Sequence, residues 1–321
     1  MNPDGFATDL ARKPDVLSQL ADALAQHNPW SRALPAEVSR VVFVGMGSSA
    51  YAAGVAAARL RARGVCAVSE IASSELLPVW GPGTLVVATS ATGGSVETLD
   101  ALDRIDPAAT TVALTNTAGS AITERCNATV ELLAEPEVGG VACRSYQHTL
   151  AMLIALECQL IGTPTDALVA AIGAAARASD HLLSTEKDWR PEVSEHLLGQ
   201  AETHLCAPAH RLSSAQQGAL MFREGPRRSA IGCESGDWSH VDVYRTKNSD
   251  LRMLVFARSK WEAQMAEWTG PRGTRVIGVG GAVPGATGTV RYPGDDVDDV
   301  RLLTETLVPE LVAAREWQAG T

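Results

Sequence analysis

Short apolar runs that end in glycine, serine or threonine recur along the first half of the chain. They predict buried strands within 41–50 and at 65–71, 84–90, 110–116 and 127–133. Stretches with apolar positions at helical spacing lie between them, up to Arg63 and at 96–105 and 119–126, and a long helix is expected at 145–160. Strands that alternate with helices in this way are typical of a parallel sheet covered on both faces.

The second half repeats this alternation less clearly. Strands are expected at 204–208, 251–257 and 274–280, and helices at 213–224 and 298–316. Ser213 and Gln216 have the spacing of a capping box at the start of the first of these helices. Residues 7–26 also have helical spacing, with a break expected near Pro14.

The length of 321 residues suits two domains, at about 150 residues for each. We therefore predict four segments: an N-terminal helical segment (1–35), a first α/β domain (36–165), a helical connector (166–193) and a second α/β domain (194–321).

Charge and cysteine content narrow the class of ligand. The formal net charge of −10 does not favour a nucleic-acid partner, which requires a concentrated basic surface. The six cysteines form no C-x-x-C pair and no two histidines have the spacing of a zinc protease, so we expect neither a metal ion nor a cofactor. The start MNPDGFATDL is unlike a signal peptide and no 18-residue apolar run follows, so we expect a cytoplasmic protein with no membrane partner.

The loop after the first expected strand has the pattern G-x-G-x-x-A, formed by Gly45, Gly47 and Ala50. Glu70 lies about 20 residues further on, as in a dinucleotide-binding fingerprint. A dinucleotide site is therefore one interpretation, and a tight turn that requires glycine for conformation alone is another.

A second loop favours a different ligand. Ser90, Thr92, Gly93 and Ser95 follow the third expected strand and directly precede a helix, and Ser48 and Ser49 hold the corresponding place after the first strand. Because the ends of parallel strands share one edge of a sheet, these hydroxyls and two helix N-termini are expected to converge there. Helix N–H groups and short hydroxyl donors together suit a phosphate monoester.

The segments GMGSSAYAAG (45–54) and SATGGSVETL (90–99) resemble the paired phosphate loops of sugar isomerase (SIS) domains, especially those in the isomerase half of glucosamine-6-phosphate synthase. The resemblance implies two SIS domains, each a flavodoxin-like α/β/α sandwich with a mainly parallel sheet. It also implies which residues hold the sugar phosphate: Gly47, Ser48, Ser49, Ser90, Thr92, Gly93 and Ser95. Ala91 and Gly94 replace two polar residues of the family pattern, so contacts from those positions are expected to be lost.

The segment 218–240 is similar to the catalytic segment of the same family. The resemblance implies that Glu224 moves a proton at C2 of the sugar and that His240 assists ring opening from a neighbouring subunit, which makes a homodimer the expected partner state. Met221 stands where the synthases have a lysine, and no lysine follows Lys260. We therefore do not expect the amine transfer of the synthases. The loops CAPA (206–209) and FARSK (256–260) lack serine-rich turns, so one phosphate site is expected in each chain.

Removal of the C2 proton by a base can have two outcomes, formation of a ketose or loss of the C3 substituent. An acetamido group on C2 disfavours the ketose, so we expect elimination of water across C2–C3, as in proteins of the N-acetylglucosamine-6-phosphate dehydratase kind, which the chain also resembles. An aldose–ketose isomerase or deaminase acting on glucosamine 6-phosphate, and a non-catalytic sugar-phosphate sensor, remain alternatives.

Overall fold

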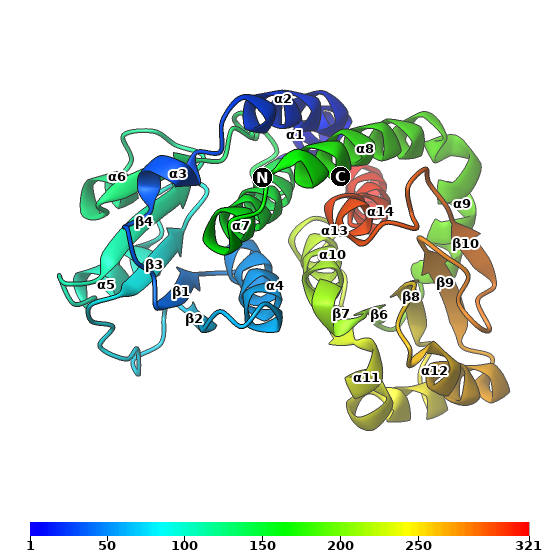
Figure 1. Cartoon of the computed structure of the whole chain (residues 1–321). Coiled ribbons are helices and arrows are strands. Elements are labelled where there is room, and N and C mark those ends of the chain that lie inside the picture. The colour runs from blue at the N-terminus through cyan, green and yellow to red at the C-terminus, as the bar shows by residue number, and fades with distance from the viewer. Residues whose placement is uncertain (321) are drawn as a thin grey trace. The chain divides into compact units, whose positions relative to one another are not determined.

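Two parallel five-stranded sheets organise the protein, and their strand orders are the same. In a computed structural model that describes residues 1–320, the orders are β2-β1-β3-β4-β5 and β7-β6-β8-β9-β10 (Figure 1). The chain groups into two compact units, one around each sheet. The first-sheet unit holds Val16–Pro136 and Arg144–Ile172, and the second-sheet unit holds Met1–Asp15, Glu137–Cys143 and the chain from Gly173 onward. The expected fold class, two α/β units with parallel sheets, is confirmed. The predicted four-segment division along the chain stays a prediction.

The first-sheet unit is built mainly from the following elements: α2 (Lys13–Gln26), α3 (Trp30–Ala33), β1 (Arg40–Gly45), α4 (Ser48–Ala62), β2 (Ala67–Ile71), β3 (Thr84–Thr89), α5 (Val96–Asp103), β4 (Thr110–Thr115), α6 (Ala121–Arg125), β5 (Ala128–Glu131) and α7 (Arg144–Ile161). Helix α8 (Asp166–Ser184) begins in this unit and belongs to the second-sheet unit from Gly173 onward. Strands β1 and β3 are almost entirely buried, as expected for central strands of a sheet covered on both faces.

Alternate residues of these strands serve opposite faces. Val42, Val44 and Val86 form an apolar cluster with residues of α5, whereas α4 packs on β1, β2 and α7 (Figure 1). The result is a three-layer α/β/α sandwich.

The second-sheet unit contains the remaining elements: α1 (Pro3–Ala11), α9 (Glu186–Leu197), β6 (Thr203–Ala207), the 3₁₀ helix η1 (Ala209–Arg211), α10 (Leu212–Glu224), β7 (Ala230–Glu234), α11 (Ser235–Val241), η2 (Val243–Lys247), β8 (Arg252–Phe256), α12 (Glu262–Thr269), η3 (Gly270–Arg272), β9 (Arg275–Val279), β10 (Gly288–Val290), α13 (Asp298–Thr304) and α14 (Leu307–Gly320). Among residues 1–320, no helix combines the length and apolar character that a membrane crossing requires.

Helices α10 and α11 cover opposite faces of the second sheet. A Cβ on Gly218 of α10 would meet Leu205 of β6, and one on Gly232 of β7 would meet the backbone of α10. The neighbouring positions point the other way, because Trp238 of α11 donates its indole N–H to His204 of β6.

The structure corrects two expectations about the second half. The expected helix at 298–316 is two helices, α13 and α14, and Pro309 is the third residue of the second, where its missing N–H interrupts no helical hydrogen bond. The expected capping box is absent: α10 begins at Leu212, and the buried hydroxyl of Ser213 has no hydrogen-bond partner within the described residues.

Candidate functional site

The carboxyl ends of β1 and β3 meet at the point where the strand order of the first sheet reverses. Strand β1 pairs with β2 on one side and with β3 on the other, and Gly45 and Thr89 are register partners at the carboxyl ends. In open α/β sheets, ligands bind in the crevice at this topological switch point. Both candidate phosphate loops start here.

The turn after β1 depends on the backbone conformation of Gly47. This residue caps α4 at φ 51° and ψ −127°, a region that residues with a Cβ rarely adopt. A Cβ there would meet no atom within 4 Å, so the requirement for glycine is conformational and not one of space. Ser48 and Ser49 then form the first turn of α4, where the helix leaves its N–H groups without intrahelical acceptors.

The loop after β3 is held by backbone contacts. Ser90 is 6% exposed and donates its N–H to Leu114 of β4 at 3.1 Å, and Gly93 donates to the Ser90 carbonyl at 3.0 Å. Gly93 has φ +68°, and a Cβ on it would lie 1.9 Å from Oγ of Ser120. This glycine is therefore required both for conformation and for space, whereas Thr92 is exposed at the loop tip.

The candidate hydroxyls differ in what they already bind. Ser95 caps α5: its Oγ accepts from the Thr98 N–H at 3.4 Å and donates to Glu97 Oε2 at 3.0 Å. Within residues 1–320, the hydroxyls of Ser48, Ser49 and Ser90 make no hydrogen bond to a protein group. These three are available to a ligand, while Ser95 would have to give up or share its capping role.

A pocket of about 530 Å³ opens beside the start of α5. It is lined by Ser73, Glu75, Val96, Glu97, Asp100 and Arg104. Its walls carry three carboxylates and one guanidinium, so negative charge prevails there.

Glu224 and His240 are not brought together within one chain. Glu224 is the last residue of α10, near the end of the sheet where β7 begins, and His240 lies in α11, which follows the other end of β7. Because α10 and α11 cover opposite faces, the second sheet lies between them. Glu224 is partly buried and His240 is exposed.

Burial raises the pKa of the Glu224 carboxyl above its ordinary value of 4.5, although the nearby guanidinium groups of Arg223 and Arg227 act in the opposite direction. A carboxylate with a raised pKa is a stronger base, which suits proton abstraction near neutral pH.

The corresponding switch point of the second sheet, between β6 and β8, is filled by side chains of the protein. Arg211 is 1% exposed, donates to the Ala257 carbonyl and forms an ion pair with the fully buried Glu305. This ion pair lies at the end of the second sheet that corresponds to the serine-rich loops of the first sheet.

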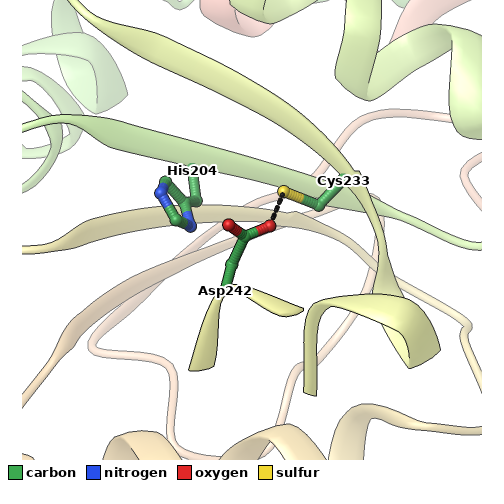
Figure 2. Close-up of side chains that lie close together, drawn as sticks. All are labelled: His204, Cys233 and Asp242. Carbon is green, nitrogen blue, oxygen red and sulfur yellow. Dashed lines mark hydrogen bonds between the residues drawn. The ribbon is translucent and has the colours of Figure 1, made fainter. Parts of the chain in front are cut away.

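One group of side chains with metal-binding chemistry could not be recognised from the sequence. His204, Cys233 and Asp242 lie together in the second-sheet unit (Figure 2). They are 29 and 9 positions apart, so only the pairing of β6 with β7 and the return of α11 over the sheet bring them together.

Comparisons with known proteins agree with the fold. Residues 36–158 match the family model of the SIS domain, and this segment includes both candidate phosphate loops. A glutamine–fructose-6-phosphate aminotransferase [isomerizing] from Methanosarcina acetivorans is 36% identical over 185 residues. The match covers 52% of this chain and only 28% of that relative, so the chain spans little more than a quarter of it.

Solved structures share the two-unit fold at low sequence identity. The C-terminal domain of glucosamine-fructose-6-phosphate aminotransferase from Francisella tularensis superposes with a TM-score of 0.77 at 15% identity, over 98% of this chain and 96% of that one. Glucosamine-6-phosphate deaminase from Thermotoga maritima gives 0.74 at 16% identity, over 98% and 95%. Tagatose-6-phosphate ketose/aldose isomerase from Escherichia coli gives 0.78 at 14% identity, over 98% and 93%. Both units of the chain therefore have the fold of these structures.

Proposed function

We propose that the chain binds a sugar 6-phosphate at the switch point of the first sheet. The observation that carries this proposal is the pairing of Gly45 with Thr89, which puts the loops of Ser48, Ser49 and Ser90 at one edge of the sheet, beside the N-termini of α4 and α5. Within residues 1–320 these three hydroxyls bind no other protein group. A phosphate at this place accepts hydrogen bonds from hydroxyl and backbone donors at the positive ends of two helices. The net charge of −10 supports recognition by such local donors and not by a basic surface.

In the proposed reaction, Glu224 removes the C2 proton of an open-chain N-acetylhexosamine 6-phosphate. The C1 aldehyde acidifies this proton by delocalising the resulting negative charge. The electron pair then forms the C2–C3 double bond, and the C3 hydroxyl leaves with a proton as water. The raised pKa of the Glu224 carboxyl, caused by burial, supports its role as the base.

His240 has a separate role in this scheme, the proton transfers that open the sugar ring. Its imidazole is exposed on α11, across the second sheet from Glu224 of the same chain. This separation supports a homodimer in which His240 serves the site of a neighbouring copy. A monomer with full activity would contradict this part of the proposal.

A second candidate function is aldose–ketose isomerisation or deamination of an amino-sugar 6-phosphate. It uses the same base and phosphate loops, and the names of the T. maritima and E. coli structures above carry these activities. The buried Met221, at a position where the synthases have a lysine, supports elimination instead, because the side chain offers no proton-transfer group.

The test is incubation of the purified chain with N-acetylglucosamine 6-phosphate in D2O, followed by proton NMR. Loss of the C2 proton signal with a new vinylic signal is expected. A ketose product, or ammonia release from glucosamine 6-phosphate, would establish the second candidate. Glu224→Gln separates an enzyme from a sensor: it should abolish turnover while sugar-phosphate affinity stays within a few fold. A wild-type protein that binds the sugar phosphate without turning it over would be a sensor.

A further inference from the structure

Three side chains with metal-binding chemistry meet inside the second-sheet unit. A ring nitrogen of His204, Sγ of Cys233 and a carboxylate oxygen of Asp242 all lie within 4.8 Å of one another (Figure 2). The Cys233 thiol donates to Asp242 Oδ2 at 3.3 Å. His204 is 0% exposed and Cys233 7%, within an apolar cluster that also contains Cys206 and Trp238.

The fold explains why these residues share one place. Cys206 of β6 and Cys233 of β7 are register partners, and His204 lies two residues before Cys206 on the same face of the sheet. Helix α11 passes over this face, and Trp238 and Asp242, four residues apart, approach it from consecutive turns. Three separate elements therefore contribute to the cluster.

A hydrogen bond from Trp238 fixes which nitrogen of His204 carries the lone pair. Trp238 donates its indole N–H to Nδ1 at 3.0 Å, and an indole can only donate, so Nδ1 carries the lone pair. In the neutral ring, Nε2 therefore holds the proton. Nε2 lies 3.3 Å from Glu202 Oε1, and the same oxygen is 2.6 Å from Nε of Arg245.

A carboxylate near the second ring nitrogen suits a metal-binding histidine, although among the described residues Nε2 of His204 is close to Glu202 without a hydrogen bond. Metal-bound histidines almost always present the other ring N–H to a carboxylate or carbonyl, which fixes the tautomer. Glu202 precedes His204 toward the amino edge of the sheet, whereas Cys233 lies toward the carboxyl edge. The proton-bearing nitrogen is thus the one beside Glu202, and the lone pair of Nδ1 is held by a single exchangeable hydrogen bond from Trp238.

We propose that His204, Cys233 and Asp242 form a zinc site. Zn²⁺ takes Nδ1 of His204 in place of the Trp238 N–H, Cys233 binds as the thiolate and releases its proton to solvent, and Asp242 supplies one carboxylate oxygen. Zinc bonds to these donors are about 2.0–2.3 Å long, so small side-chain rotations bring the three atoms into range. Cys206, the register partner of Cys233, belongs to the same apolar cluster but is not one of the three grouped ligands.

The carboxylate of Glu202 also lines a polar pocket of about 570 Å³, together with Gly199, Gln200, Ala201, Arg228, Ser229 and Arg245. A metal bound by the three ligands would join β6, β7 and the segment after α11, and so hold α11 on the sheet. The proposal does not depend on the sugar-phosphate function.

The experiment is a Co²⁺ titration of the full chain after treatment with a chelator and a thiol reductant. We expect one equivalent of Co²⁺ to produce a thiolate-to-cobalt charge-transfer absorption that Zn²⁺ abolishes. Cys233→Ser should remove the absorption. Cys66→Ser is the matched control, because Cys66 is an exposed thiol open to adventitious binding, and it should leave the absorption unchanged.

If Cys233→Ser fails to fold, two further measurements test the zinc site. Glu202→Gln removes the carboxylate charge near Nε2, together with its ion pair to Arg245, and should weaken zinc binding by about 10- to 100-fold. The Trp238 indole N–H signal in a ¹⁵N NMR spectrum should shift on metal addition, because its acceptor is taken. The proposal is overturned if no charge-transfer band forms or if the band depends on Cys66. It is also overturned if zinc leaves the Trp238 signal unchanged and Glu202→Gln leaves the affinity for zinc unchanged.

Discussion

Gly45 and Thr89 are register partners at the carboxyl ends of neighbouring parallel strands. Each is followed within a few residues by serines at the start of a helix, Ser48 and Ser49 after one strand and Ser90 and Ser95 after the other. The pairing brings two loops that are about 40 residues apart in sequence to one edge of the sheet, where each becomes half of a single candidate site.

Ser90→Ala should weaken sugar-phosphate binding about tenfold or more. A hydrogen bond to a charged group contributes about 1.5–3 kcal/mol, and the Ser90 hydroxyl has no protein partner among residues 1–320 to compensate. Calorimetry with N-acetylglucosamine 6-phosphate measures the change. Thr129→Ala, an exposed hydroxyl on the edge strand β5, is the control and should bind as wild type does. Equal affinity for the two variants would remove Ser90 from the site.

Gly93→Ala should both destabilise the protein and impair ligand binding. The new Cβ would lie 1.9 Å from Oγ of Ser120, and φ at this residue is +68°. We expect a loss of about 1–3 kcal/mol in the free energy of unfolding. Gly54→Ala is the matched control: this exposed glycine lies inside α4 and a Cβ there meets nothing within 4 Å, so about 0.4–1 kcal/mol of stabilisation is expected. Urea unfolding measures both, and a Gly93→Ala variant as stable as wild type would refute the loop geometry.

The pH profile of turnover should report Glu224. A base acts only when deprotonated, so activity should fall as the pH drops through the raised pKa of this carboxyl, and the acidic limb of kcat/KM should lie above 4.5. Arg223→Gln removes a positive charge that lowers this pKa, so the limb should move to higher pH. Arg275→Gln, an exposed arginine on β9, is the charge-matched control and should leave the limb in place. A limb that stays fixed in Arg223→Gln would argue against Glu224 as the titrating base.

The first half of the fold could be predicted from the sequence because its central strands are buried on both faces. Runs such as VVFVG (41–45) are apolar at every position, and each is followed by a glycine or serine turn. Strands β7 and β10 escaped the sequence analysis. AIGCE has alternating exposure and a glycine at its centre, and GTV is three residues long at the sheet edge, so neither is a continuous apolar run.

The sequence could suggest candidate site residues only where they are close together along the chain. The hydroxyls of 48–49 and 90–95 each belong to one short loop, and parallel pairing explains their meeting. His204, Cys233 and Asp242 come from two strands and the segment after α11, and nothing in their spacing indicates the register that pairs Cys206 with Cys233. The Arg211–Glu305 ion pair was unpredictable for the same reason, since it joins residues 94 positions apart.

Lys13 and Glu310 form an ion pair between the start of α2 and helix α14, and both side chains are 0% exposed. Glu310→Gln should destabilise the second-sheet unit by about 3–5 kcal/mol, because it leaves the Lys13 ammonium buried without a counter-charge. The double variant Lys13→Met with Glu310→Leu should regain most of this loss, since two apolar side chains of similar volume need no desolvated charge. Guanidinium unfolding of the two variants and of the wild type measures the difference. If the double variant were as unstable as Glu310→Gln, the cost would come from packing and not from the uncompensated charge.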